Sequence, residues 1–352
     1  MSGGEIFTSS AYNSEEVFAK ETQTLFFNNW LCVGRLHDLE TAGGHLCLEV
    51  YGEVVLVVSD SESVQAFSAA CLHKGAIVEE VVRGGTKEFQ CPYHGWRYKL
   101  DGTLKFRPLE ASFTEPLCPD ARLKRFGCAV WLGWIFVNLS GIADMPQFML
   151  SNLTEQLATW KIDRMKPVME PIEFMGSFNW KLLCENVGDS YHIPHTHANT
   201  LLGADYKNVE WVVDENSYLK TSHKSFSDHK VGMFGELSKT LPKDFSQSWA
   251  LVVFPFHIFT VALDFVVWQH VQPISPAQTK TTFHLLAHQS TTEAIEAVRE
   301  SICSVWMEDQ MMFESVQRGS RSEFFTTSEE YASSLEYGSS VFRKWWRRSM
   351  KW

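Results

Sequence analysis

The segment Glu185–His197 constrains this chain more than any other. It reads E-N-V-G-D-S-Y-H-I-P-H-T-H and holds four side chains that can bind a metal: Glu185, Asp189, His192 and His197. On a helix, positions 185, 189 and 192 share one face, because residues i, i+4 and i+7 follow the 3.6-residue period. Two imidazoles and one carboxylate, with positions left open, form a ligand set for non-haem Fe(II). The segment therefore predicts a metal site, with hydrogen-bonded interior histidines as the alternative.

Pro194 lies between the two histidines and affects how they can meet. The residue before a proline is disfavoured in helical conformation, so we expect the helix over 178–193 to end here. His197 would then reach the same ion from the following turn. The two imidazoles would approach from different backbone directions.

Composition is that of an ordinary globular protein. The 352 residues suffice for two domains, 45% of them are hydrophobic, and the formal net charge is −11. That charge argues against a nucleic-acid partner, which requires clustered Lys and Arg. The start lacks a signal peptide, and polar residues interrupt the longest apolar region, 250–268. Eight scattered cysteines do not form a disulfide scaffold. We expect a cytoplasmic protein without a membrane segment.

The secondary structure expected from the sequence changes twice along the chain. A capping box at Asn13–Glu16 predicts a helix over 14–29. Short β-branched runs separated by turns follow, at 45–50, 54–59, 64–69 and 134–139. We place a boundary at 141–146. The fold class is therefore α+β, with an N-terminal helix in 1–30, an antiparallel β domain in 31–145 and a mixed domain in 146–352. In the last domain we expect helices near 152–160, 178–193 and 292–318, and strands at 208–214, 249–260, 261–271 and 280–288.

A second set of metal-binding residues lies in the β domain. The segments A-C-L-H-K-G and F-Q-C-P-Y-H-G-W place Cys71 and His73 on one loop and Cys91 and His94 on another. Zinc also accepts two cysteines and two histidines, but zinc fingers usually pair like with like. One cysteine and one histidine on each loop are typical of a Rieske [2Fe–2S] centre, where the cysteines hold one iron and the histidines the other. We therefore predict a Rieske cluster.

With both motifs in view, the chain resembles the catalytic α subunits of Rieske non-haem iron oxygenases over nearly its full length. It is most similar to the branch that contains the glycine betaine, choline and carnitine monooxygenases. The matching segments are C-L-H-K-G, C-P-Y-H-G-W, G-D-S-Y-H-I-P-H-T-H and E-D-Q-M-M-F-E-S-V-Q-R-G. The resemblance implies an antiparallel β Rieske domain, followed by a catalytic domain with an antiparallel sheet flanked by helices.

The resemblance also implies a role for each candidate residue. The cluster ligands would be Cys71, His73, Cys91 and His94. The mononuclear iron would be held by His192 and His197. Asp189 would be a bridging carboxylate that relays electrons from a cluster histidine across a subunit boundary. Lys74 stands where the family commonly has arginine, which leaves the ligands intact.

The third iron ligand is expected from a late helix, where Glu308, Asp309 and Glu314 are available. Asp309 interrupts an inward-facing apolar row, whereas Glu308 lines up with polar residues. The apolar row consists of Val298, Ile302, Val305, Met312 and Val316. A buried carboxylate must be paired or bound to a metal. The family pattern also selects Asp309, with a buried ion pair as the alternative. Glu185 is then expected to orient a ligand or a neighbouring backbone group, and Asn186 receives no role.

Together the two sites predict a terminal oxygenase. The cluster would deliver electrons singly, and the mononuclear Fe(II) would bind O2 beside a small organic substrate. The chain has no G-x-G-x-x-G motif, so NAD(P)H would be oxidised by a separate flavin reductase, with or without a ferredoxin. The resemblance implies a homotrimer with head-to-tail contacts. We expect monooxygenation by C–H hydroxylation or N/O-demethylation. Aromatic cis-dihydroxylation is an alternative, and a Rieske electron carrier is an alternative of another class.

The sequence does not identify the substrate. Pocket candidates by location alone are Phe226, Met233, Phe234, Phe254, Phe256, His257, Phe259 and Trp268. No group of aromatic or acidic residues indicates a cage for a quaternary ammonium ion. The C-terminal F-R-K-W-W-R-R-S-M-K-W is expected to form an amphipathic helix that packs its tryptophans. A docking surface for an acidic electron donor is the alternative for this segment.

Overall fold

The computed structural model describes residues 7–60, 63–141, 144–150, 152–201, 204, 206–224, 247–262, 265–288, 291–325 and 334–352. The chain divides into two compact units. One unit consists of residues 26–163, and the other combines residues 1–25 with residues 164–352. Among the described residues, no helix has the length and apolarity needed to cross a membrane.

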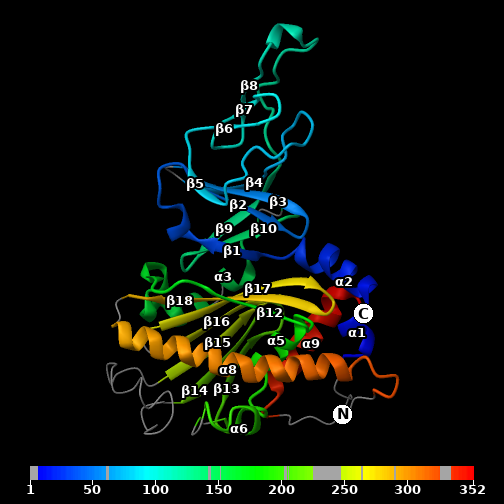
Figure 1. Cartoon of the computed structure of the whole chain (residues 1–352), viewed down its shortest axis with the longest axis vertical. Helices are drawn as coiled ribbons and strands as arrows, with labels where there is room; N and C mark the ends of the chain where they lie inside the picture. The colour runs from blue at the N-terminus through cyan, green and yellow to red at the C-terminus, as the bar shows by residue number, and fades with distance from the viewer. Residues whose placement is uncertain are drawn as a thin grey trace. The chain divides into compact units, whose positions relative to one another are not determined.

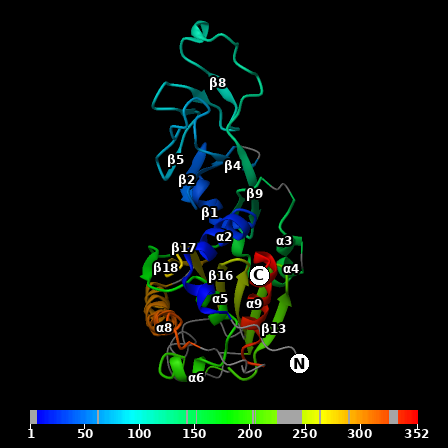
Figure 2. The same cartoon turned by 90° about the vertical axis from the view of Figure 1, so that its right-hand side faces the viewer.

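The unit of residues 26–163 is built on antiparallel strands (Figures 1 and 2). Its seven-stranded sheet has the order β1-β10-β9-β4-β3-β2-β5, and β6, β7 and β8 form a second, three-stranded sheet. The strands are β1 (Leu31–Arg35), β2 (Gly44–Val50), β3 (Glu53–Ser59), β4 (Val64–Ser68), β5 (Arg83–Gly85), β6 (Phe89–Gln90), β7 (Arg97–Tyr98), β8 (Leu104–Phe106), β9 (Arg125–Trp131) and β10 (Trp134–Asn138). The four strands predicted in this region are confirmed within a residue or two. Two short helices follow, α3 (Gln147–Leu150) and α4 (Leu153–Leu157).

Strand β3 separates two apolar cores in this unit. Leu56 and Val58 face one core, and Val55 and Val57 face the other, because neighbouring side chains of a strand point to opposite faces. The first core also contains Cys71 and Cys91. The two predicted cluster loops are therefore attached to a packed core.

The other unit contains an eight-stranded antiparallel sheet of order β11-β18-β17-β16-β15-β14-β13, in which β12 also pairs with β18. The strands are β11 (Lys166–Pro167), β12 (Ile172–Gly176), β13 (Glu210–Asp214), β14 (Tyr218–Lys224), β15 (Gln247–Val253), β16 (His257–Ala262), β17 (Phe265–Ser275) and β18 (Gln278–Ala287). The predicted strand 249–260 is in fact two strands joined by a turn at 254–256. This turn is buried and apolar, so hydrophobicity alone gives no sign of it.

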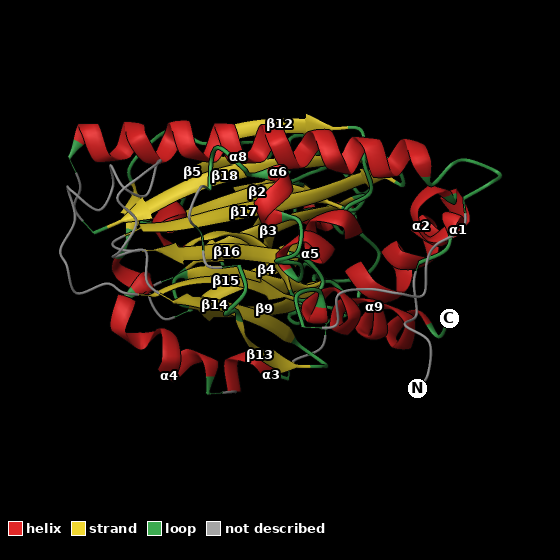
Figure 3. Cartoon of the chain, turned by 90° about the horizontal axis from the view of Figure 1, so that it is seen from below, coloured by secondary structure: helices red, strands yellow, loops and turns green. Residues whose placement is uncertain are grey.

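Helix α8 (Thr292–Gly319) confirms the helix predicted near 292–318. It runs along this sheet (Figure 3). Its Trp306 packs against Phe174 of β12 and Phe283 of β18, with ring centroids 5.6 and 5.0 Å apart. This contact identifies the sheet face that α8 covers. The C-terminal helix α9 (Tyr337–Met350) buries Trp345 and Trp346, as expected for an amphipathic helix.

The helices near the predicted iron segment are shorter than expected. Helix α5 (Lys181–Val187) ends at Gly188, where a Cβ atom would lie 2.3 Å from the backbone nitrogen of Ser339. The chain turns there, so Asp189 is not on the helix. Pro194 does not end a helix but begins one, α6 (Ile193–Thr196). This fits the preference of proline for the first helical turn.

At the N-terminus, the predicted helix over 14–29 is divided into shorter pieces. They are α1 (Ser9–Asn13), α2 (Glu15–Glu21) and a π-helical turn at Thr22–Phe26. Ser14 caps α2, and its side chain accepts a hydrogen bond from the Val17 amide.

A buried ion pair connects α2, α5 and α9. The Nζ of Lys181 lies 2.6 Å from Glu21 Oε1, and both side chains are fully buried. The indole nitrogens of Trp180 and Trp346 donate to the same carboxylate, at 3.0 and 2.6 Å. The Glu21 charge is therefore compensated by three donors.

We predict that Lys181→Met destabilises the protein by about 3–5 kcal/mol, because it leaves the Glu21 carboxylate buried and unpaired. Chemical denaturation of the purified protein measures this. The matched control is Lys280→Met, which removes a partly exposed pair of similar length with Glu173, at 2.7 Å. It should cost no more than about 1 kcal/mol. Equal losses in the two variants would contradict the prediction.

Candidate metal centres

The two loops with one cysteine and one histidine each have the same backbone geometry. The Gly75 amide donates to the Cys71 carbonyl at 2.9 Å, and the Gly95 amide donates to the Cys91 carbonyl at 3.0 Å. The two glycines have φ values of +74° and +71°, which residues with a side chain rarely adopt. Each loop is thus a tight turn that carries one cysteine and one histidine.

The four side chains form two chemically distinct pairs. Cys71 and Cys91 are buried, whereas the rings of His73 and His94 are exposed and their Nδ1 atoms lie 3.2 Å apart. The hydroxyl of Tyr98 lies 3.0 Å from the Cys71 sulfur. Two buried thiols and two converging imidazole nitrogens are the donors that a Rieske [2Fe–2S] cluster requires. The residues present fit that cluster.

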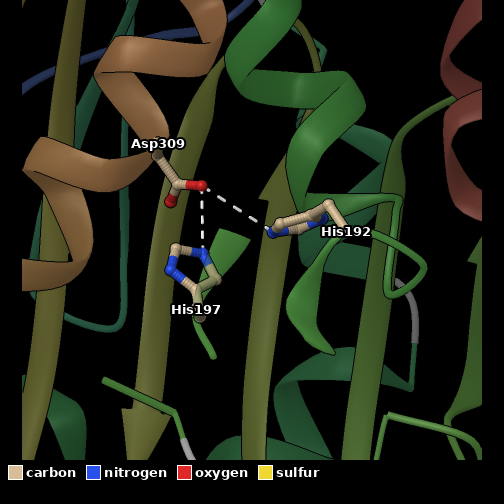
Figure 4. A group of neighbouring side chains, drawn as sticks. All are labelled: His192, His197 and Asp309. Carbon is tan, nitrogen blue, oxygen red and sulfur yellow. Dashed lines mark ion pairs between the residues drawn. The ribbon is translucent and has the colours of Figure 1, made fainter. Parts of the chain in front are cut away.

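The second candidate centre is formed by His192, His197 and Asp309 (Figure 4). The two histidines flank α6, and Asp309 comes from α8. Asp309 Oδ1 lies 3.0 Å from His197 Nε2 and 3.7 Å from His192 Nε2. One donor atom from each residue lies within 4.8 Å of the others. Two imidazoles and one carboxylate from three directions fit a mononuclear non-haem iron.

Each histidine of this centre has a carboxylate on its other ring nitrogen. Asp189 Oδ2 lies 3.4 Å from His192 Nδ1, and Glu308 Oε2 lies 2.8 Å from His197 Nδ1. The hydrogen bond with Glu308 fixes the tautomer and the ring orientation of His197 and leaves its Nε2 available to a metal. Asp189 lies beside His192 Nδ1 at ion-pair distance without a hydrogen bond. Burial disfavours the charged form of His197, but hydrogen bonds to Asp309 and Glu308 raise its pKa above the ordinary value.

Two further residues of this centre were not found from the sequence. Glu308 was considered only as a ligand; it instead contacts His197 and accepts a hydrogen bond from the Thr200 hydroxyl at 2.6 Å. Asn186 received no role, yet its side-chain nitrogen lies 3.2 Å from both His192 Nε2 and Asp309 Oδ1. For Glu308 the position beside Asp309 was an available signal. Nothing in the pattern alone indicated Asn186.

The inward row of α8 differs from the predicted one. Met312 and Val316 are exposed, and the buried positions in this half of the helix are Trp306, Phe313 and Gln317. Steps of three and four residues allow two neighbouring rows to be drawn through a long helix. Asp309 was selected as a member of the first row, whose second half is exposed; it also lies three residues from Trp306 and four from Phe313, on the side of the row that is buried.

Glu185 contacts residues of the terminal helices α1 and α9. The Tyr12 hydroxyl donates to its carboxylate at 2.6 Å, and Arg343 Nε pairs with its other oxygen. Ser339 Oγ donates to the Glu185 carbonyl at 2.6 Å. These contacts attach α5 to α1 and α9.

Five of the pocket candidates prove to be packed in the core. Phe254 stacks on Trp345 with ring centroids 4.8 Å apart, and Phe256 packs on Trp180. The other three, His257, Phe259 and Trp268, lie on one face of the sheet. That face is opposite to α8, because Trp268 pairs with His284 whereas the neighbouring Gln269 pairs with Phe283. The candidates Phe226, Met233 and Phe234 lie outside the described residues.

Comparison with known proteins matches each unit to a family. A model described as the Rieske [2Fe-2S] domain matches residues 29–125. A second, described as the ring hydroxylating alpha subunit (catalytic domain), matches residues 154–352. The fold and the two donor sets together define a Rieske non-haem iron oxygenase. This chain belongs to the ring-hydroxylating α-subunit family of these enzymes, as the resemblance implied.

Individual relatives agree with this family over nearly the whole chain. The glycine betaine monooxygenase oxygenase subunit of Chromohalobacter salexigens is 25% identical, over 96% of this chain and 84% of its own length. The chloroplastic choline monooxygenase of Amaranthus tricolor is 23% identical, over 97% and 77%.

Two solved structures share the fold. The quaternary ammonium Rieske monooxygenase CntA matches with a TM-score of 0.83 at 20% identity, covering 97% of this chain and 94% of its own. Naphthalene 1,2-dioxygenase from Rhodococcus sp. matches with a TM-score of 0.77 at 20% identity, covering 97% and 93%. The predicted fold class is confirmed: a Rieske β domain and a catalytic domain with an antiparallel sheet and helices.

The enzymes of this family carry a Rieske cluster and a mononuclear iron, which together activate O2 with electrons from a separate reductase. In this chain, residues around the candidate iron site contact the imidazole rings of His192 and His197. Glu308 holds the His197 imidazole through a hydrogen bond, Asp189 lies 3.4 Å from His192 Nδ1, and Asn186 can donate a hydrogen bond beside them.

We predict that Asp309→Ala loses the mononuclear iron and retains the cluster, because the two candidate centres share no ligand. Metal analysis and the visible spectrum of the anaerobically purified protein measure both. Glu308→Gln should retain the iron but weaken its binding by roughly 10–100-fold, since it acts only through His197. Loss of iron from the Glu308 variant alone would refute the assignment.

Proposed function

We propose that this chain is the oxygenase component of a monooxygenase that inserts one oxygen atom of O2 into a small organic substrate, by C–H hydroxylation or N/O-demethylation. The observation that carries the proposal is the presence of both donor sets in one chain. One set joins Cys71 and Cys91 with two exposed imidazoles, and the other joins His192, His197 and Asp309. An electron carrier of the Rieske type would need only the first.

In this proposal the residues have distinct tasks. Cys71, His73, Cys91 and His94 hold the cluster. His192, His197 and Asp309 hold the iron. Asp189 bridges towards a cluster histidine of another subunit, and its 3.4 Å contact with His192 supports this role. Glu185 acts at a distance, through its attachment of α5 to the terminal helices.

We favour monooxygenation over dihydroxylation because the two relatives compared by sequence are monooxygenases. The curated relatives described above are monooxygenases of glycine betaine and choline, whereas the dioxygenase is matched by its fold at 20% identity. Quaternary ammonium compounds are therefore the first substrates to test, and other N-methylated or O-methylated compounds follow. Cis-dihydroxylation of an aromatic ring is the alternative, because the same ligand set serves both reactions.

Electron delivery in this proposal needs other chains. A flavin reductase or ferredoxin would reduce the cluster, and a head-to-tail homotrimer would bring the cluster of one subunit to the iron of the next. The exposed rings of His73 and His94 support such a contact. So does the partly exposed surface beside the iron ligands, where Asp189, Tyr191 and Met311 lie.

We predict that one turnover of the chemically reduced enzyme with ¹⁸O2 and a substrate transfers a single labelled oxygen. Mass spectrometry of the product measures this. For a demethylation, the label is sought in the released formaldehyde, under conditions that limit its exchange with water. Two labelled atoms in one ring product would establish the dioxygenase alternative instead. The Asp309→Ala enzyme, which should keep the cluster, is the matched control and should give no product.

A complementation experiment tests the transfer between subunits. A His73→Ala chain should lack a working cluster, and an Asp309→Ala chain should lack the iron. We predict that each is inactive alone and that co-expression restores activity, because a mixed trimer pairs an intact cluster with an intact iron. Light scattering of the mixture reports the oligomeric state. Mixed trimers without activity would show that electrons stay within one chain.

A further inference from the structure

An aromatic ring lies flat on one of the cluster histidines. Trp96 stacks on His73 with ring centroids 5.0 Å apart and an angle of 3° between the planes. His73 belongs to the first cluster loop, and Trp96 directly follows Gly95 of the second. The contact therefore joins the two loops. Trp96 itself is buried, although His73 is exposed.

Arg107 packs against this tryptophan. The guanidinium carbon of Arg107 lies 5.7 Å from the centroid of Trp96 and 4.1 Å from that of Phe113, and its side chain is only 10% exposed. Both distances lie within the range of cation–π contacts. Phe113 also contacts Trp96 edge to face, with centroids 6.0 Å apart. Trp96 is thus contacted by two residues of one segment, Arg107 and Phe113.

Glu110 holds this arginine in place. Arg107 Nε donates to Glu110 Oε2 at 2.8 Å, and its Nη2 donates to Oε1 at 2.5 Å. Nη2 also donates to the Glu115 carbonyl at 3.0 Å, and the Leu117 amide donates to Glu110 Oε1 at 2.9 Å. A two-pronged pair of this kind fixes geometry as well as charge. Because the two charges compensate each other, the pair contributes little net field at the cluster.

We propose that the Arg107–Glu110 pair is a clamp that holds Trp96 against His73 and thereby sets the reduction potential of the cluster. Arg107 does not touch a ligand, so it is a positioning residue that acts through Trp96. The clamp fixes the plane of the His73 imidazole and keeps water from one side of it. Solvent exposure and the orientation of ligands are two of the ways by which proteins tune such clusters.

The direction of the effect follows from charge. Reduction adds one electron to the cluster, and water stabilises the added negative charge. A loosened clamp admits water, so it should raise the potential. A raised potential in both variants differs from what the loss of a charge alone would produce. Removing the Arg107 charge alone would lower the potential, and removing the Glu110 charge alone would raise it.

The test compares Arg107→Met with Glu110→Gln in the full oxygenase, by redox titration of the cluster followed by EPR. We expect both substitutions to raise the potential, each by a roughly threefold to tenfold change in the reduction equilibrium. This corresponds to about 28–59 mV, at 59 mV per tenfold for one electron. The EPR spectrum should also broaden, as the His73 ring becomes less fixed. Arg107→Lys keeps the positive charge but loses the two-pronged pair. It should raise the reduction potential by a smaller amount than Arg107→Met.

The matched control is the nearby pair of Lys105 and Glu88, which is 2.7 Å long and about half exposed at the lysine. Lys105→Met removes one positive charge from the same unit without touching Trp96, and should leave the EPR spectrum unchanged. Opposite shifts for Arg107→Met and Glu110→Gln, or no shift in either, would overturn the proposal. If Arg107→Met does not retain its cluster, Phe113→Leu serves as the second variant, and an unaltered potential there overturns the proposal equally.

This inference rests on the cluster ligands of the proposed function but not on the reaction. Reduction potentials are measured without substrate or O2. An unchanged potential would therefore refute the clamp alone, whereas a product with two labelled oxygens would refute monooxygenation alone.

Discussion

The burial of two carboxylates around α5 is the constraint on which the catalytic unit depends. Glu21 is compensated by Lys181 and two indole donors, and Glu185 by Tyr12 and Arg343. A buried carboxylate is tolerated only when such donors surround it. Tyr12 and Glu21 lie near one end of the chain and Arg343 and Trp346 near the other, so the terminal helices hold α5 in position. Its last turn then presents Asn186, and the chain continues directly to Asp189.

The iron site uses carboxylates in a second way. His192 and His197 each contact a carboxylate through Nδ1, and each directs Nε2 to the same Asp309 oxygen. The orientation of the His197 ring is thus set by Glu308, a group that need not touch the metal, and His192 has Asp189 nearby at ion-pair distance. The cluster loops follow a related principle with different groups. There, buried cysteines anchor the loops in the core, and Trp96 supports an exposed imidazole from one face.

Local patterns in the sequence predicted much of this arrangement. The strands around β3 alternate or are continuously apolar over short runs, and α8 has a long periodic stripe with a threonine cap. Both signals lie within one element, so they need no knowledge of the fold. The apolar turn at 254–256 and the break of α5 at Gly188 were missed. Gly188 lies against a neighbour distant in sequence, the backbone of Ser339. The turn at 254–256 contains Pro255, a local signal within an otherwise apolar run.

The sequence by itself determined the chemistry of this protein. The spacing of cysteines and histidines in two loops, and the histidine pair after Asp189, limit the metals that can bind, because ligand type and number select the metal. Only the tertiary structure decided which carboxylate serves which histidine, that Glu185 holds helices together, and that Asn186 lies beside the iron ligands. The residue type of an aspartate or glutamate does not by itself reveal its role. Its role follows from the donors that surround it after folding, and those donors come from distant parts of the chain.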